Sequence, residues 1–188
     1  DKTITAANAA VKSGKCRQVC SGSAYVEDDI DELLERAQSG GTTAKTAKEW
    51  VDIHDEKIDA LEGLIEELEG QPILVAYSFR FSLARIRRRL GDDIRVIGGG
   101  TRDSDAAKFK REWLDGQIQT LFVHPDSAAY GLNLQTWGSD YPRHVCWYDV
   151  TWDYEKYDQL NRRIRRRGNK SSRVFIHHIV ARDTIDGR

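Results

Sequence analysis

From residue 73 onward the sequence alternates between short apolar runs and longer segments of helical periodicity, and this alternation constrains the fold more than any other feature. The apolar runs, each predicted to be a strand, are ILVAYS (73–78), IRVI (94–97), TLFV (120–123), HVCWYDV (144–150) and RVFIHHIV (173–180). Strands that alternate with helices at this spacing form βαβ units, in which right-handed crossovers make the sheet parallel. We therefore predict an α/β fold in which ligands bind near the carboxyl ends of the strands.

Three segments between these runs have the apolar spacing of helices that pack one face on a sheet. They are FSLARIRRRL (81–90), DAAKFKREWLDG (105–116) and DYEKYDQLNRRIRRRG (153–168), and a glycine ends each of the last two. SAAYGLNLQ (127–135) is predicted to be a loop with a short helix. Residues 49–69 also carry one apolar stripe, so we predict a helix there that ends at GQP (70–72).

The first 48 residues have the least regular pattern, and we predict an irregular, partly helical extension. Its expected parts are a helix in AANAAVKSGKCRQVC (6–20), a turn or loop at SGSAY (21–25), a short helix in DDIDELLERAQ (28–38) and a flexible link in SGGTTAKTAK (39–48). The predicted domains are therefore residues 1–48, an N-terminal extension, and residues 49–188, the α/β domain. Because the chain contains no Met, we expect it to be a segment of a longer protein.

The composition is typical of a soluble globular protein: 39% of the residues are hydrophobic, 31% are charged, and no apolar run is long enough to span a bilayer. Cys16, Cys20 and Cys146 are too few for a disulfide framework, and the spacing of the first two does not suit a zinc site. We expect reduced thiols in a cytosolic protein and no metal site. His177 and His178 lie in a predicted strand, and we interpret them as structural.

Basic residues gather in two places although the formal net charge is −1. One cluster is Arg85, Arg87, Arg88 and Arg89, and the other places five arginines within residues 162–167. Such clusters are most often solvated surfaces. Two of them on an acidic background favour a phosphate-bearing partner.

The second basic cluster has the more specific pattern. If its helix continues to residue 167, Gln159, Arg163 and Arg166 share one stripe beside the buried face. A guanidinium is a fixed fork of donors that suits phosphate oxygens, so two on one stripe are suited to bind a polyphosphate. The alternative is a solvated basic helix with local ion pairs to acidic residues: Asp153, Glu155 or Asp158.

HPDSAAYGLNLQ (124–135) follows a predicted strand and combines small residues, a glycine and an amide, a composition that lets a ligand approach the backbone. This stretch is followed along the chain by QLNRRIRRRGNK (159–170), and then by a strand and TID (184–186). YGLNLQ and these later stretches together resemble the second RecA-like lobe of Swi/Snf-type superfamily-two helicases. The resemblance covers roughly residues 50–186. The chain is most similar to the phage and prophage members of this family, and the stretches that carry this similarity are SGSAY, HDEKIDALEGLIEEL and ILVAYSF. The spacing Q-x-x-x-R-x-x-R is that family's sixth motif, although Asn169 stands here in place of the usual glutamine after its glycine.

The resemblance implies a RecA-like three-layer sandwich with a mostly parallel central sheet, and it implies roles for particular residues. Arg163 and Arg166 correspond to arginine fingers that reach the γ-phosphate of ATP held on another lobe, and Gln159 helps to organise that cleft. The residues implied on the ATP side of the following motif are Gly131, Asn133 and Gln135. The residues implied on the nucleic-acid side are Ser78, Arg80, Thr101, His124, Pro125 and Ser127.

Two parts that such an ATPase needs are missing from the sequence: a phosphate loop, G-x-x-x-x-G-K-[ST], and an acidic pair that holds magnesium. SGKC (13–16) lacks the first glycine and the Ser or Thr, and DELL (31–34) lies in a helical pattern rather than after a strand. We therefore expect ATP and Mg²⁺ to be bound mainly by a first lobe of the full-length protein. The isolated chain is expected to be inactive.

The function implied by the resemblance is the second motor lobe of a DNA-dependent ATPase, a Swi/Snf-like translocase of phage or prophage origin in a bacterial cytoplasm. Its implied partners are the N-terminal RecA-like lobe of the same polypeptide, joined through residues 1–48, and duplex DNA bound without sequence preference; no membrane is implied. The alternatives are a catalytically silent nucleic-acid-binding module and a strand-separating or RNA-directed helicase. A flavodoxin-like small-molecule enzyme is a further alternative, which no cofactor fingerprint supports.

Overall fold

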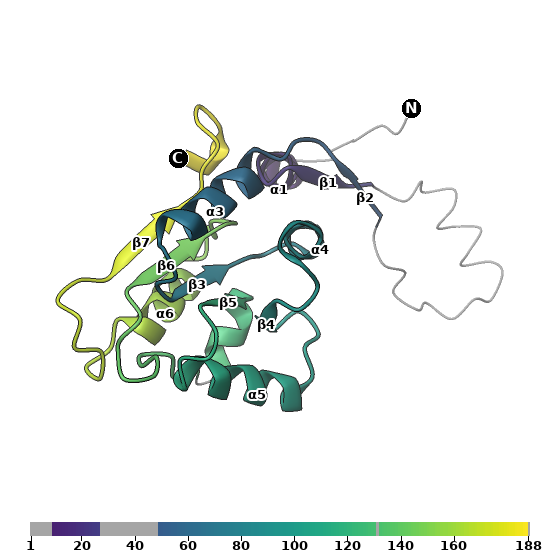
Figure 1. The fold of residues 1–188 in the computed structure, drawn as a ribbon. Coiled ribbons are helices and arrows are strands. Elements are labelled where there is room, and N and C mark those ends of the chain that lie inside the picture. Colours follow the sequence, from purple (N-terminus) through teal and green to yellow (C-terminus); the bar gives the residue numbers. More distant parts are fainter. Residues whose placement is uncertain (1–8, 27–48, 131, 188) are drawn as a thin grey trace.

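The structure is a computed structural model that describes residues 9–26, 49–130 and 132–187 (Figure 1). The helix predicted over residues 28–38, the link over 39–48 and Gly131 lie outside these residues. Within the part described, no helix is both long and apolar enough to cross a membrane.

A five-stranded sheet forms the middle of the fold, in the order β4-β5-β3-β6-β7, and every neighbouring pair is parallel. Its strands are β3 (Ile73–Ala76), β4 (Arg95–Ile97), β5 (Thr120–Val123), β6 (His144–Trp147) and β7 (Phe175–His178). The predicted α/β class with a parallel sheet is therefore confirmed. The register sets Ala76 level with both Val123 and Trp147, so the carboxyl ends of three adjacent strands reach the same edge.

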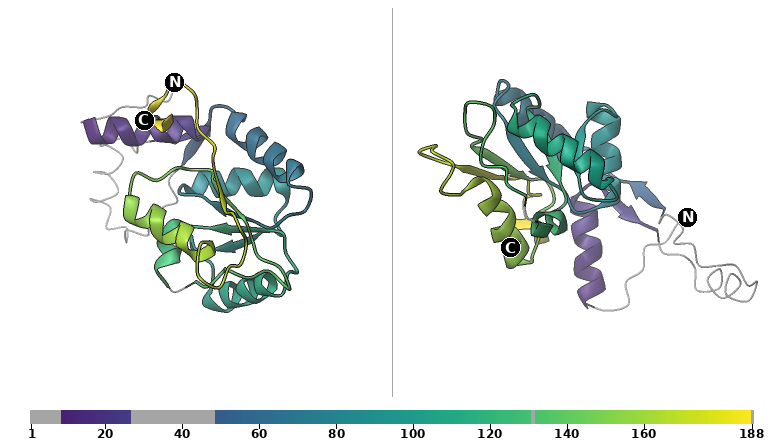
Figure 2. Two further views of the ribbon diagram at one scale, coloured as in Figure 1. Left: turned by 90° about the vertical axis from the view of Figure 1, so that its left-hand side faces the viewer. Right: turned by 90° about the horizontal axis from the view of Figure 1, so that it is seen from below.

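Helices cover both faces of this sheet and make three layers (Figure 2). On one face α3 (Glu56–Glu67) and α4 (Arg80–Leu90) contribute Ile58, Leu61 and Ile86 to a buried cluster. On the other face α5 (Asp103–Leu114) and α6 (Tyr154–Ile164) contribute Trp113, Leu160 and Ile164. Because both faces are covered, β3 and β6 are buried at every position, which explains their continuous apolar sequences.

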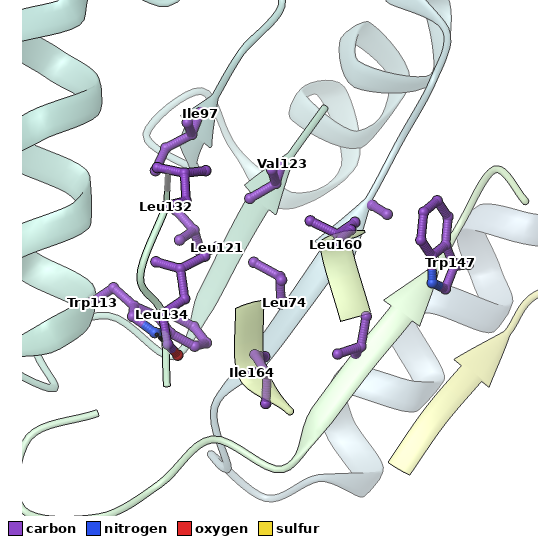
Figure 3. Packing of buried hydrophobic residues seen from close by; sticks show 12 residues of the cluster. Leu74, Ile97, Trp113, Leu121, Val123, Leu132, Leu134, Trp147, Leu160 and Ile164 are labelled. Carbon is purple, nitrogen blue, oxygen red and sulfur yellow. Dashed lines mark hydrogen bonds between the residues drawn. The ribbon is translucent and has the colours of Figure 1, made fainter. Parts of the chain in front are cut away.

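The core on the α5–α6 face also holds the segment that follows β5. A 3₁₀ helix, η1 (Pro125–Tyr130), leaves the end of β5, and the chain beyond it returns across the sheet with Leu132 and Leu134 buried (Figure 3). The Trp113 indole N–H donates to the carbonyl of Leu134 at 3.2 Å, and this bond ties the returning segment to α5. Between and after these leucines, the Asn133 side chain is exposed and the Gln135 side chain is half-buried.

The N-terminal segment adds a second, smaller sheet that the sequence did not predict. The helix α1 (Ala9–Cys20) leads into β1 (Ser23–Tyr25), which pairs antiparallel with β2 (Trp50–Asp52). The prediction of a turn or loop at SGSAY is therefore wrong at residues 23–25, and the helix predicted from residue 49 begins only at Glu56. The cause is tertiary, because the β1–β2 ladder takes the backbone groups of Trp50–Asp52. The backbone N–H of Val26 also donates to Glu49 O at 2.9 Å.

The helix α6 is shorter than its sequence pattern. It ends at Ile164, and Arg165 has a ψ of 76°, so Arg166 and Arg167 are not helical and Gly168 does not end the helix as predicted. The side-chain amide of Asn169 explains the early end, because its Nδ2 atom donates to the carbonyls of Ile164 (3.2 Å) and Pro142 (2.8 Å). The last carbonyl of the helix is thus capped by a side chain from five residues further along.

Candidate functional site

Four residues predicted on the nucleic-acid side gather at the carboxyl edge of the sheet. Ser78, Thr101 and His124 follow β3, β4 and β5, and Ser127 lies in η1. The ring Nε2 of His124 lies 3.3 Å from Ser78 O. The hydroxyl of Thr101 is turned into its own loop, 2.8 Å from Gly98 O.

The loop after β4 is built to approach this edge closely. Gly98 has a φ of +104°, and a Cβ placed there would lie 2.2 Å from Ser127 Oγ. Only glycine suits a backbone in that conformation with so close a neighbour. The three-glycine sequence thus brings the loops after β4 and β5 into contact, and it leaves Gly100 facing open space.

The turn between β3 and α4 places Ser78 and Arg80 at the same edge. Ser78 is half-buried and the Arg80 side chain is exposed. Their backbone N–H groups are already bonded, that of Ser78 to Asp149 Oδ2 (2.8 Å) and that of Arg80 to the Tyr25 hydroxyl (3.0 Å).

A second group of predicted residues lies along α6 and the returning segment. Arg166 Nη1 donates to Asn133 Oδ1 at 2.7 Å. Leu160 and Ile164 anchor α6 on the sheet (Figure 3). The Arg163 side chain between them is half-buried. Its Nε atom is buried and has no hydrogen-bond partner. Burial lowers the pKa of the Arg163 guanidinium, and the positive charge of Arg166 lowers it further.

Arg163 is the half-buried member of the cluster, and the other four arginines are exposed: Arg162, Arg165, Arg166 and Arg167. Arg162 forms an ion pair with Asp158 at 2.6 Å, as expected of a solvated basic helix. Among the described residues, neither Arg163 nor Arg166 forms an ion pair with a carboxylate. A partly buried cation without a counter-ion is unfavourable, so this part of the surface is suited to bind an anion.

A cavity of about 760 Å³ adjoins this group. Its lining holds all five arginines of the cluster, two tyrosines and four further residues: Arg162, Arg163, Arg165, Arg166, Arg167, Tyr154, Tyr157, Asp158, Gln159, Asn161 and Ile176. The arginine group and the carboxyl-edge group are separate sites. Asn169, three residues after Arg166, is bonded to Pro142 O just before β6 begins, so the end of the arginine segment lies toward the amino ends of the strands.

Gln159 and Gln135 have surroundings of their own. Gln159 donates to Glu155 Oε1 at 2.9 Å, and among the described residues no hydrogen bond joins it to Arg163 or Arg166. Gln135 packs against Gly168, where an added Cβ would lie 2.2 Å from Gln135 Nε2. The Oε1 atom of Gln135 is buried and has no partner. The predicted ATP-side residue Gly131 lies outside the described residues.

The first basic cluster is not a free phosphate site. Arg85 is 3% exposed and pairs with Asp55, Arg88 pairs with Asp52 at 2.6 Å, and Arg89 pairs with Asp59 at 2.6 Å. The interpretation that both basic clusters suit a phosphate-bearing partner is therefore wrong for three of these four arginines. Carboxylates from the β2–α3 region neutralise them.

The histidines of β6 and β7 bond to one another and to Tyr157. His144 Nδ1 lies 2.9 Å from His177 Nε2, and His178 Nε2 lies 2.9 Å from the Tyr157 hydroxyl. Burial lowers the pKa of all three imidazoles. Within the residues that the structure describes, no group of three or more potential ligands could hold a metal ion.

Sequence reasoning missed one polar residue at the carboxyl edge. Asp149 is 1% exposed, and its carboxylate accepts hydrogen bonds from Ser21, Ser78 and Phe79. An acidic residue directly after an apolar strand was the available signal, because parallel strands present such residues at the ligand-binding edge.

The fold is that of the RecA-like lobes found in helicase and ATPase domains, and the predicted RecA-like sandwich is confirmed. The chain is similar to the C-terminal part of the Fun30 ATPase domain, with a TM-score of 0.57 and 18% identity over 85% of this chain and 52% of that chain. It is also similar to the Pyrococcus furiosus Hef helicase domain, with a TM-score of 0.50 and 18% identity over 84% of this chain and 30% of that chain.

The sequence itself is similar to a phage protein, as the resemblance to phage members implied. It is 34% identical over 190 residues to the protein p41 of Acyrthosiphon pisum secondary endosymbiont phage 1. The match covers 99% of this chain and 35% of p41, so the chain spans about a third of the length of that relative. No family model matches the sequence.

Proposed function

We propose that this chain is the second motor lobe of a DNA-dependent ATPase, a Swi/Snf-like translocase. In this proposal residues 49–188 form the lobe, and residues 1–48 join it to a first RecA-like lobe elsewhere in the same polypeptide. The first lobe binds ATP and Mg²⁺, and the arginine group of this lobe closes the nucleotide site. The protein acts in the bacterial cytoplasm, where a phage or prophage genome would be expressed.

The observation that carries the proposal is the environment of Arg163. Its Nε atom is buried without a partner, and Arg166 stands beside it, held by Asn133 at 2.7 Å. Two guanidinium groups without a carboxylate leave a net positive charge next to the cavity of about 760 Å³. A γ-phosphate brought there by the first lobe supplies the missing acceptors, and its transition-state charge is stabilised by the same groups.

The carboxyl edge supplies the DNA half of the proposal. Ser78, Arg80, His124 and Ser127 lie just beyond the ends of two adjacent strands, β3 and β5, and in this proposal they offer hydroxyl, imidazole and guanidinium groups to a phosphate backbone. Thr101, whose hydroxyl is bonded within its own loop, supports the loop after β4. Contacts with a phosphate backbone carry little sequence information, so binding should be unspecific and sensitive to salt. The separation of this edge from the arginine group lets one lobe hold DNA and ATP at different places.

The test is ATP hydrolysis by the longer protein that contains this segment, with and without duplex DNA. Arg166→Ala should abolish most of the DNA-stimulated turnover, because arginine fingers contribute roughly 10³–10⁵ in rate in other nucleotide hydrolases. Arg162→Ala is the matched control, since Arg162 is exposed and paired with Asp158, and it should leave turnover within about twofold of wild type.

Two outcomes would contradict the proposal. Equal turnover in the Arg166→Ala and Arg162→Ala proteins would remove the finger assignment. Duplex binding without hydrolysis in the wild-type protein would instead favour a catalytically silent nucleic-acid-binding module.

A further inference from the structure

The carboxylate of Asp149 joins three segments at the carboxyl edge of the sheet. Its Oδ1 accepts a hydrogen bond from Ser21 Oγ at 2.6 Å, and its Oδ2 accepts from the backbone N–H groups of Ser78 (2.8 Å) and Phe79 (3.3 Å). Asp149 follows β6, Ser78 follows β3, and Ser21 follows α1 of the N-terminal segment. One buried side chain therefore sets the position of the β3–α4 turn relative to β6 and to α1.

The start of α4 would otherwise be a place for an anion. The first N–H groups of a helix have no acceptor within the helix, and they attract phosphate. Here the N–H groups of the N-cap Phe79 and of Arg80 are occupied, by Asp149 and by the Tyr25 hydroxyl (3.0 Å), and so is that of Ser78 just before the helix. The backbone N–H groups of residues 78–80 are thus bonded within the protein itself, which leaves the side chains of Ser78 and Arg80 as the groups of this turn that a ligand would meet.

The N-terminal segment supports the same turn from outside. Arg17 of α1 donates to Val150 O at 2.7 Å, and its guanidinium lies 5.7 Å from the centre of the Phe79 ring and 5.2 Å from that of Trp152. Arg85 of α4 donates to Ser21 O at 3.2 Å. The α1–β1 segment and the β3–α4 turn therefore behave as one packed unit.

We propose that Asp149 is a positioning residue for nucleic-acid binding. Together with Ser21 and Tyr25 it holds the β3–α4 turn so that the Ser78 hydroxyl and the Arg80 guanidinium face the phosphate backbone of duplex DNA. The N-terminal segment, residues 9–26, on this account supports the DNA-binding turn from behind and makes no contact with DNA itself. This inference rests on the DNA contact proposed above and extends it to residues that touch no DNA.

The direction of the change in DNA affinity distinguishes a positioning role of Asp149 from a purely electrostatic effect of its charge. Removing a negative charge near a polyanion would by itself strengthen binding. If Asp149 positions the turn, Asp149→Ala should instead weaken binding of the 188-residue chain to a random-sequence duplex by about tenfold, the equivalent of losing a charge-assisted hydrogen bond. In the same protein the amide hydrogens of Ser78 and Phe79 should exchange faster with solvent.

Three control variants make the test specific. Asp149→Asn carries the same charge as Asp149→Ala but keeps an acceptor, so it should restore most of the affinity and the amide protection. Tyr25→Phe should speed exchange at Arg80 and leave Ser78 unchanged. Leu61→Ala, which creates a cavity under α3 away from the turn, should lower the melting temperature without changing the affinity of the folded protein.

Unchanged or tighter duplex binding by Asp149→Ala would overturn the inference, and so would unchanged amide protection at Ser78 and Phe79. Wild-type protein that binds no duplex in low salt would contradict the proposed DNA contact instead. In that case the amide exchange alone decides whether Asp149 positions the turn.

Discussion

Arg166 Nη1 lies 2.7 Å from Asn133 Oδ1, and this hydrogen bond joins the end of the arginine segment to the chain that returns from β5. The bond spans 33 positions of sequence, and Leu134, which is fully buried, fixes the backbone on the Asn133 side. Arg166 itself lies beyond the end of α6, so the helix does not hold it. Asn133 is therefore the group that limits where this guanidinium can go.

We expect Asn133→Ala to lower DNA-stimulated ATP hydrolysis by the longer protein roughly tenfold, because a mobile guanidinium spends little time in the productive position. The loss should be smaller than that of Arg166→Ala, which removes the group entirely. Asp158→Ala is the control, since it likewise frees an arginine of the cluster, Arg162, from its side-chain partner and leaves the bond between Arg166 and Asn133 in place. Turnover of Asn133→Ala equal to that of Asp158→Ala would show that the bond has no catalytic consequence.

Gly168→Ala should lower the free energy of unfolding by about 0.5–1.5 kcal/mol, because the new methyl group would push the end of the Gln135 side chain out of its rotamer. Shortening the partner should relieve the overlap, so the double variant Gly168→Ala/Gln135→Ala should lose less stability than the sum of the two single variants. Gly63→Ala is the matched control: it lies in α3 with no atom within 4 Å of the new Cβ, and it should be neutral or slightly stabilising. Urea unfolding followed by circular dichroism measures all four proteins, and additive losses would refute the overlap.

Arg80→Ala should weaken binding to duplex DNA at low salt and reduce the slope of log K against log salt by about one unit. The reason is that one exposed guanidinium releases about one counter-ion when it contacts a phosphate. Arg88→Ala is the comparison variant, since Arg88 is also exposed on α4 but pairs with Asp52. Equal slopes for wild type and Arg80→Ala, measured by fluorescence anisotropy, would exclude a phosphate contact at this side chain.

The buried ion pair of Lys57 with Asp186 should behave differently from the surface pairs of α4. Both side chains are almost fully buried, 3% and 4% exposed, and Lys57 Nζ also donates to Tyr148 O. Lys57→Met leaves a buried carboxylate unpaired and should cost about 3–5 kcal/mol of unfolding free energy. The double variant Lys57→Met/Asp186→Leu should recover much of that loss. Thermal unfolding measures both proteins: a double variant no more stable than the single one would show that the unpaired carboxylate is not the main cause of the loss.

We expect the histidines of β6 and β7 to make the folded protein less stable in mild acid. Burial lowers the folded-state pKa of His144, His177 and His178, so the unfolded chain binds protons more readily than the folded protein. Their contribution is complete above the unfolded pKa of about 6.5 and is lost as the pH falls through the lower folded values. The melting temperature should therefore drop between about pH 7 and 5, and His144→Gln/His177→Gln should make that drop shallower. A drop of equal size in the variant would assign the pH dependence to other groups.

The local sequence pattern was enough to predict the sheet and its helices. It failed where contacts with residues far along the chain determine the local structure. ILVA at 73–76 could only be a strand covered on both faces, and the structure shows that. The end of α6 depends on the side chain of Asn169, which no helical periodicity contains. Trp50–Asp52 form a strand and not the start of the predicted helix, because they pair with β1, which lies some 25 residues earlier.

The candidate site likewise has features that local sequence predicts and features that depend on contacts between distant segments. The stripe of Gln159 and Arg163 follows from helical geometry, whereas the bond from Arg166 to Asn133 depends on how two separate segments meet on the sheet. The α4 arginines looked equivalent to those of α6 because charge counts ignore partners. Asp52 and Asp55, which neutralise Arg88 and Arg85, lie 36 and 30 positions earlier.

The hydrogen bond between Val26 N and Glu49 O has a consequence for how such a chain can change. It brings Val26 and Glu49 together directly beyond the paired residues Tyr25 and Trp50, so the two strands stay in register at that end of the ladder. Because bringing two chain positions together costs only about 0.6 kcal/mol more for each doubling of the number of residues between them, the pairing of β1 with β2 should depend little on how many residues separate them. The contacts that α1 and β1 make with the lobe therefore place little constraint on the length of chain between Val26 and Glu49.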